Sequence, residues 1–281
     1  MTKNRTFKQV DVFTAIPLLG NPVAVILDGA GLTDAEMLRA ANWTNLSETT
    51  FVVPVTDNRA DYHVRIWTPQ RELPFAGHPT LGTAHAVIEA GLATPKNGQL
   101  VQQCQVGLVD VSVTDSGLSF RLPRHNVDPV EAEDDLIAAI GGAHLLAKPP
   151  KLVDVGPRWI IAELVSPAVV DGLNVNLPAL TIYNEATDST GLTVFADTDE
   201  GIIVRSFAPT DGLMEDPVCG SGNGAVAAFR LHHGTVCDGS IYTARQGSHM
   251  ARDGYVHVRI EGNDVHIGGG CVTCIDGIFR L

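Results

Sequence analysis

The pattern of apolar and polar residues along this chain of 281 residues predicts a protein rich in β-strands. Short runs of β-branched and aromatic residues recur between glycines and prolines, which is typical of strands. In the first half the expected strands are Val10–Phe13, Val23–Leu27, Thr50–Val55, Tyr62–Trp67, Leu100–Gln103, Leu108–Val113 and Leu118–Leu122. In the second half they are Leu152–Val155, Trp159–Leu164, Leu180–Tyr183, Ile202–Phe207, Ile241–Ala244, Tyr255–Ile260, Val265–Ile267 and Cys271–Phe279.

Four segments show the spacing of helices instead. Thr33 and Glu36 have the spacing of a capping box, which predicts a helix from this point to about Asn45. The other helices are expected over Pro79–Ala90, Ala132–Ile140 and Gly222–His233. Gly91 is expected to close the Pro79–Ala90 helix in a left-handed conformation.

A duplication organises the chain. Gly77 and Gly91 lie fourteen residues apart, and so do Gly220 and Gly234; each pair brackets a run of small, mostly apolar residues. Upstream of each pair lies a strand-like motif that begins with arginine and ends with proline, Arg65–Pro69 or Arg205–Pro209. The chain is therefore expected to consist of two related halves, each of which presents the start of a tightly packed helix.

Both bracketed helices are apolar almost all round, so each is expected to lie buried within a sheet. This predicts an α+β fold of two pseudo-repeated domains, each a curled, mostly antiparallel sheet around a central helix. The polar segment Pro123–Pro129 marks the expected domain junction. The N-terminal domain then spans residues 1–122, completed by the C-terminal strand 271–281, and the other spans 123–270, with the active site in the cleft between them.

Composition narrows the class of protein. Apolar residues make up 44% of the chain and charged residues 18%, which is typical of a globular protein. The formal net charge of −13 argues against nucleic acid or an anionic membrane surface as a partner. Five cysteines without framework spacing, no signal peptide and no membrane-spanning apolar run together predict a soluble, reduced, cytoplasmic protein.

The first candidate site surrounds Glu48 and His78. Glu48 stands between a predicted helix and an apolar strand, where desolvation is expected to raise the pKa of its carboxyl and suit it to proton transfer. A solvated turn residue is the alternative. Ser47 beside it can cap the helix or bind a ligand, and Gly77 and His78 open a core helix. His78 there is a donor or a proton relay, or it is structural.

The second candidate site lies at the start of the other core helix. Asp216 precedes a proline, which predicts an extended or turn backbone that directs its carboxyl into the cleft. Gly220 lets backbone N–H groups approach a ligand closely, and Ser221 adds a hydroxyl. Cys219 is expected to have a lowered thiol pKa and to act as a base or nucleophile; a small packing residue is the alternative. Two such helix starts predict a small anionic substrate.

Other motifs are weaker. The glycine-rich stretch Gly220–Gly224 lacks the lysine of a phosphate-binding loop. Cys271 and Cys274 have the spacing of half a metal site, but no second pair of ligands accompanies them. No metal site is expected.

Three segments together resemble the phenazine-biosynthesis PhzF-like isomerase family: Asn45–Phe51, Phe75–Gly82 and Glu215–Ala225. The resemblance extends over essentially the whole chain. It implies the two-domain diaminopimelate epimerase-like fold, no cofactor and a homodimer. It also implies acid/base catalysis like that of trans-2,3-dihydro-3-hydroxyanthranilate isomerase, a biosynthetic enzyme, on a small carboxylate.

Carried onto this sequence, the family pattern gives Glu48 the role of general acid/base. It implies substrate binding and assistance by His78, Asp216 and Ser221, and backbone contacts by Gly77 and Gly220. Cys219 departs from the pattern, because the prototype has threonine there and the epimerases have a catalytic cysteine. Two alternatives therefore stay open: an amino-acid epimerase or racemase that uses Cys219, and a non-catalytic small-molecule binder.

Overall fold

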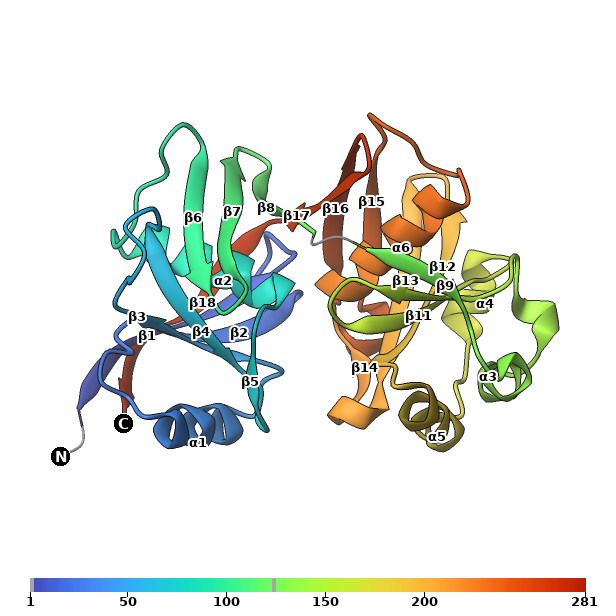
Figure 1. The fold of residues 1–281 in the computed structure, drawn as a ribbon, viewed down its shortest axis with the longest axis horizontal. Coiled ribbons are helices and arrows are strands. Elements are labelled where there is room, and N and C mark those ends of the chain that lie inside the picture. Colours follow the sequence, from blue (N-terminus) through green and yellow to red (C-terminus); the bar gives the residue numbers. More distant parts are fainter. Residues whose placement is uncertain (1–2, 123–124) are drawn as a thin grey trace. The chain divides into compact units, whose positions relative to one another are not determined.

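The computed structural model describes residues 3–122 and 125–281, which fold into two compact units (Figure 1). Unit 1 comprises the residues up to Arg121 together with Gly268–Leu281, and unit 2 comprises Leu122–Ile267. Part of the expected junction, residues 123–124, lies outside the described residues. The rest of it is no simple linker, because Asn126–Pro129 forms a strand that pairs with Lys151–Asp154.

Unit 1 is a curled sheet in the order β18-β1-β2-β3-β4-β6-β7-β8. The pairs β2–β3 and β4–β6 are parallel and the others are antiparallel, while the short β5 adds to β4. Its strands are β1 (Asn4–Val12), β2 (Asn21–Ile26), β3 (Thr49–Val53), β4 (Tyr62–Trp67), β5 (Glu72–Leu73), β6 (Gln99–Cys104), β7 (Gly107–Thr114), β8 (Gly117–Arg121) and β18 (Cys271–Arg280). Its helices are α1 (Asp34–Thr44) and α2 (Gly77–Glu89).

Unit 2 repeats this plan in the order β9-β10-β11-β12-β13-β15-β16, again with two parallel pairs, β11–β12 and β13–β15. Its strands are β9 (Asn126–Pro129), β10 (Lys151–Asp154), β11 (Arg158–Glu163), β12 (Gly191–Thr198), β13 (Gly201–Ala208), β14 (Leu213–Asp216), β15 (Ile241–Gln246), β16 (Gly254–Glu261) and the first four residues of β17 (Asp264–Gly269). Its helices are α3 (Glu133–Ile140), α4 (Pro167–Gly172), α5 (Leu177–Thr187) and α6 (Gly220–His232).

The central helices α2 and α6 confirm the predicted duplication. Both have 13 residues, and both are followed, after a single cap residue, by a glycine in the left-handed region, Gly91 or Gly234. Most residues of each helix are buried against the strands of its own unit. A Cβ at Gly82 would lie 2.3 Å from a methyl carbon of Val23, so the sheet approaches α2 too closely for a larger residue.

The repeated arginine motifs form equivalent ion pairs. Arg65 on β4 binds Glu72 through two hydrogen bonds of 2.6 Å, and Arg205 on β13 binds Glu215 through two of 2.9 Å. In each case the guanidinium also lies over an aromatic ring two residues further on, Trp67 or Phe207. Each pair ties the strand before the core helix to the segment that leads into it.

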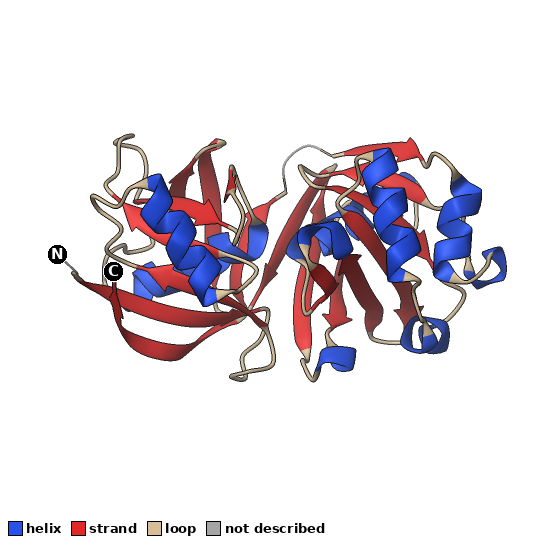
Figure 2. Ribbon diagram, turned by 90° about the horizontal axis from the view of Figure 1, so that it is seen from below, coloured by secondary structure: helices blue, strands red, loops and turns tan. Residues whose placement is uncertain are grey.

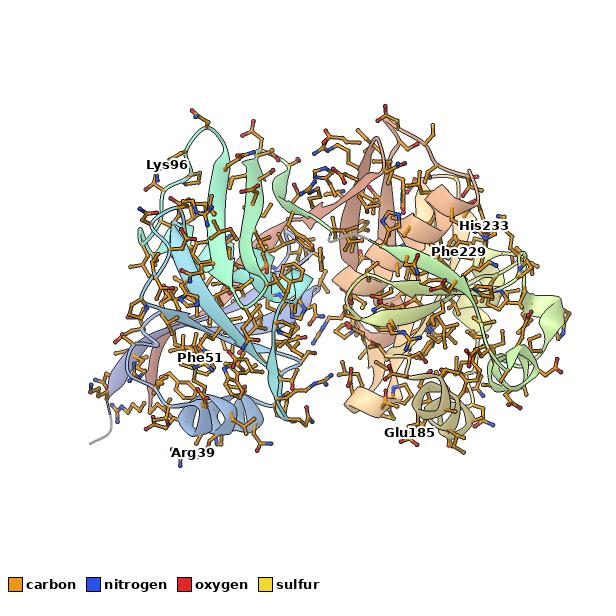
Figure 3. All side chains as sticks on the ribbon, in the orientation of Figure 1. Arg39, Phe51, Lys96, Glu185, Phe229 and His233 are labelled. Atoms are coloured by element: carbon orange, nitrogen blue, oxygen red, sulfur yellow. The ribbon has the colours of Figure 1, made fainter. Side chains whose placement is uncertain are left out.

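The remaining helices lie outside the sheets (Figure 2). Helix α1 packs on β3 and β4, where Met37 contributes to an apolar cluster around Phe51. Helices α3, α4 and α5 cover the corresponding face of unit 2. Figure 3 shows Phe51 and Phe229 inside their units and Glu185 of α5 at the surface. None of the helices in the described ranges is long and apolar enough to cross a membrane.

The capping box predicted for α1 is present. The Thr33 hydroxyl accepts a hydrogen bond from the Glu36 N–H at 3.3 Å, and the Thr33 N–H donates to the Glu36 carboxylate at 2.8 Å. We expect Thr33→Ala to lower the free energy of unfolding by about 1 kcal/mol, because one N–H at the helix start loses its acceptor. Urea denaturation of the two proteins measures the difference, and an unchanged midpoint would contradict the assignment.

Three sequence predictions need correction. The apolar run Leu180–Tyr183 is not a strand but part of α5, which starts after an Asn176 cap. Strand β12 was not predicted, although it lies at the centre of unit 2 between β11 and β13. Strand β1 starts at Asn4 rather than Val10. Its first half was missed because it contains polar residues such as Lys8, which is buried and forms ion pairs with Glu89 and Asp276.

Candidate active site

Glu48 is held at the start of β3. Its backbone carbonyl accepts a hydrogen bond of 3.4 Å from the Ala24 N–H, because β3 runs parallel to β2. The Glu48 side chain is only 15% exposed. Ser47 lies beside it, partly buried, between α1 and β3. The sheet thus fixes a carboxyl group that is largely withdrawn from solvent.

His78 contacts Glu48 directly. Its Nε2 atom lies 3.3 Å from Oε2 of Glu48, although the two groups are not aligned for a hydrogen bond. The ring donates its hydrogen bond to the carbonyl of Pro22 in β2 instead. Strand β2 therefore positions both members of the pair, which no sequence spacing had indicated.

The environment of His78 keeps its imidazole neutral. Burial lowers the pKa of His78 to about 3, and the hydrogen bond to Pro22 opposes this only in part. Because Nε2 has no hydrogen bond, the proton of the neutral ring resides on Nδ1, which faces Pro22. The lone pair of Nε2 is then presented to the Glu48 carboxyl.

Both core helices begin with two unused N–H groups. In α2 the Thr80 N–H bonds to the carbonyl of Ala76, and in α6 the Asn223 N–H bonds to that of Cys219. Within the described ranges, no acceptor bonds to the N–H groups of the first two residues of either helix, Gly77 and His78 in α2 and Gly220 and Ser221 in α6. Each pair, with the positive end of its helix dipole, favours an anionic group.

Asp216 ends β14, just before α6. Its Oδ1 atom accepts a hydrogen bond of 3.1 Å from the Val218 N–H. Burial raises the pKa of the Asp216 carboxyl to about 6, with a smaller contribution from the charge of Glu215, while hydrogen bonds from Cys219 and Val218 oppose the increase. Asp216 therefore holds its proton about two pH units higher than an ordinary aspartate.

The pKa of the Cys219 thiol is raised, so the prediction of a lowered pKa was wrong. Burial and the adjacent Asp216 carboxylate raise the pKa of Cys219 well above its usual value. Its sulfur caps α6 by accepting the Gly222 N–H at 3.2 Å, and it lies 3.6 Å from the Ser221 hydroxyl oxygen. The structure thus gives Cys219 the role of a helix cap with a protonated thiol at neutral pH.

Two residues near this helix start were not singled out from the sequence. The indole N–H of Trp159 on β11 donates to the Ser221 hydroxyl oxygen at 3.0 Å, which orients that hydroxyl. Gln246 on β15 bonds to the segment between Asp216 and Cys219. Most buried indole and amide groups have a hydrogen-bond partner, but the partner's identity depends on strand order and is absent from the local sequence.

Cys271 and Cys274 lie on β18, whose pairing with β1 has a bulge at Cys274. In the parts of the chain that the structure describes, no three His, Cys, Asp or Glu side chains are grouped to hold a metal ion.

The fold is shared with solved structures. A phenazine biosynthesis protein of the PhzF family from Bacillus anthracis superposes with a TM-score of 0.85, covering 99% of both chains at 24% identity. Together with the two-unit architecture, this defines the diaminopimelate epimerase-like fold.

Sequence comparison assigns the family. The model of the phenazine biosynthesis-like proteins (PhzC-PhzF) matches residues 10–277. Antisense-enhancing sequence 1 of Schizosaccharomyces pombe is 37% identical, with 97% of each chain covered. The trans-2,3-dihydro-3-hydroxyanthranilate isomerase of Pseudomonas chlororaphis is 32% identical, with 97% of this chain and 98% of that protein covered. The chain belongs to the PhzF-like family, and it is an isomerase of small molecules.

Proposed function

We propose that this isomerase works without a cofactor and moves a proton within a small carboxylate substrate, with Glu48 as the general acid/base. The observation that carries the proposal is the Glu48–His78 pair, a largely buried carboxyl 3.3 Å from the bare nitrogen of a neutral imidazole. A positioned carboxyl of this kind accelerates proton transfer by about 10²–10⁴-fold.

The proposed reaction moves one proton within a substrate that has conjugated double bonds. The Glu48 carboxylate removes a proton from one carbon, and the electron pair moves along the conjugated system. The carboxylic acid then returns the proton to another carbon, so that substrate and product have the same composition. Neutral His78 can accept a hydrogen bond from the acid form of Glu48, which holds the proton between the two transfers.

The substrate's carboxylate is proposed to bind at the helix starts. In unit 2 the N–H group of Gly220 and the Ser221 hydroxyl are suited to carboxylate oxygens, and in unit 1 the N–H group of Gly77 is suited to the same kind of oxygen. Asp216, with its raised pKa, is suited to bind a polar group next to the carboxylate and to share a proton with it. Ser47 and Cys219 complete the proposed contacts. A homodimer stays a prediction of the family resemblance, and a cytoplasmic location stays a prediction of the composition and cysteine usage.

Exchange with solvent tests this function. The protein is incubated in D2O with trans-2,3-dihydro-3-hydroxyanthranilate, the substrate named for the Pseudomonas relatives, and then with other small unsaturated carboxylates. Proton NMR is expected to show an isomerised product, which carries deuterium at the new C–H position wherever the Glu48 carboxyl exchanges its proton with solvent before returning it. A protein that binds these carboxylates without product or deuterium would be a non-catalytic binder.

Cys219→Ala separates the isomerase from an epimerase that uses a thiol. We expect the variant to retain the rate of isomerisation within about threefold, because a thiol with a raised pKa contributes a helix cap rather than a base. The rate is measured on the substrate that the exchange experiment identifies. Loss of all activity in Cys219→Ala would favour the epimerase alternative.

A further inference from the structure

Gln246 is the last residue of β15 and is only 2% exposed. Its amide makes three hydrogen bonds to the start of the second core helix. The oxygen accepts from the Cys219 N–H at 3.1 Å and from the side-chain amide of Asn223 at 2.8 Å. The nitrogen donates to the backbone carbonyl of Asp216 at 3.0 Å. One side chain thus joins both ends of the four-residue segment from Asp216 to Cys219 and the first turn of α6.

The segment from Asp216 to Cys219 is also enclosed by the connection between β15 and β16. A Cβ at Gly247 would lie 2.6 Å from the Pro217 carbonyl, and a Cβ at Gly254 would lie 2.3 Å from a methyl of Val218. Gly247 has φ +103°, a conformation that only glycine adopts readily. The segment therefore has close neighbours on this side, but Gln246 supplies the hydrogen bonds that set its register against α6.

We propose that Gln246 is a positioning residue for the isomerisation: it fixes the segment from Asp216 to Cys219, and so orients the Asp216 carboxyl and the N–H groups of Gly220 and Ser221 toward the substrate. The inference rests on the proposed function, because these groups act only if a carboxylate substrate binds them. Misplacement of such groups by about 1 Å costs about 10²-fold in rate.

The other unit contains a natural control. Gln102 lies on β6, the strand equivalent to β15, two residues before the position that matches Gln246, and it is also fully buried. Its amide donates to the Thr80 hydroxyl, in the first turn of α2, at 2.9 Å, and its oxygen accepts from Tyr62 at 3.0 Å. Both glutamines thus bond to the fourth residue of their core helix. Of these two glutamines, Gln246 alone also bonds to the segment that leads into its core helix, from Asp216 to Cys219.

The experiment compares Gln246→Leu with Gln102→Leu. Both variants lose buried hydrogen bonds, so both are expected to have a lower midpoint of thermal unfolding. We expect Gln246→Leu to reduce kcat/KM by about 10–100-fold, with a fall in kcat. Gln102→Leu is expected to keep the wild-type kcat/KM. Equal kinetic effects in the two variants would overturn the proposal.

Gln246→Glu keeps the size of the side chain and provides a second variant if Gln246→Leu does not fold. Its carboxylate still accepts from Cys219 and Asn223, but its other oxygen faces the Asp216 carbonyl and cannot donate. Protonation restores the donor, so we expect the activity relative to wild type to recover as the pH falls. Within the described ranges, the titratable groups that shift the pKa of the Asp216 carboxyl are Cys219 and Glu215, and Glu215 is paired with Arg205. A ratio that does not change with pH would contradict the role of the hydrogen bond to Asp216.

A readout without turnover separates this inference from the proposed function. The titration of the Asp216 carboxyl is followed by carbon NMR of protein with labelled aspartate, in wild type and in all three variants. The midpoint is expected to move in both Gln246 variants and to stay unchanged in Gln102→Leu. If the midpoint moves but wild type isomerises no carboxylate, the proposed function fails and the positioning of Asp216 stands. A midpoint that stays unchanged in the Gln246 variants would refute the positioning role.

Discussion

Glu48→Gln is expected to reduce the rate of isomerisation by about 10²–10⁴-fold, a larger kinetic effect than we expect from Gln246→Leu or Cys219→Ala. Glutamine has nearly the size of glutamate but cannot take up a proton from carbon, so His78 keeps its neighbour while the acid/base is lost. The change is expected in kcat, with little change in substrate binding. Stopped assays of turnover and deuterium uptake measure the first, and thermal shift with substrate measures the second.

Glu185→Gln is the matched control for this experiment. Glu185 lies at the surface of α5 (Figure 3), so its removal changes the net charge equally and leaves the candidate site intact. It is expected to have wild-type activity. If Glu48→Gln keeps its activity while Cys219→Ala loses it, the assignment of Glu48 is wrong and the thiol is the base.

Asp216→Asn is expected to make the folded protein more stable at neutral pH while it reduces activity. Folding raises the pKa of Asp216 from about 3.8 to about 6, so the folded state holds a proton that the unfolded state has released. The stability of the wild type therefore falls as the pH rises through this window, by up to about 3 kcal/mol. Asparagine does not titrate, and its oxygen can still accept the hydrogen bond from Val218.

The pH dependence of the stability difference between wild type and Asp216→Asn tests this prediction. Urea denaturation at several pH values is expected to give equal stabilities for wild type and Asp216→Asn near pH 3.5. The variant is expected to gain an advantage that grows toward pH 6 and then stays constant. The value of 3 kcal/mol is an upper bound, because part of Asp216 remains in contact with solvent. An advantage independent of pH would show that the carboxyl is not desolvated in the folded state.

Those parts of the fold that depend on local signals could be predicted from the sequence. The cap of α1 and the left-handed glycines after α2 and α6 are encoded within a few residues, and the duplication revealed itself by repeated spacing. The strand predicted at Leu180–Tyr183 failed because a four-residue apolar run has no period that separates a strand from one face of a helix. Strand β12 was missed although its apolar run is continuous, as is typical of a strand between two neighbours.

The candidate site shows the same division. Glu48, His78 and Asp216 could be named from short motifs, but the contact between Glu48 and His78 depends on the parallel pairing of β2 with β3 and could not. The pKa of Cys219 was predicted in the wrong direction because the helix start is a local feature, whereas its burial and its distance from Asp216 are not. Tertiary packing decided the protonation state.

The strand order of unit 1 has a consequence for how the chain folds while the ribosome makes it. Strand β1 pairs with β18, which the ribosome makes roughly 260 residues later. Until β18 is made, the part of unit 1 that contains Glu48 therefore has an unpaired sheet edge at β1. Unit 2, whose strands are contiguous in the chain, can fold before this edge is paired. Chaperones that shield strand edges during synthesis would bind this unpaired edge of unit 1.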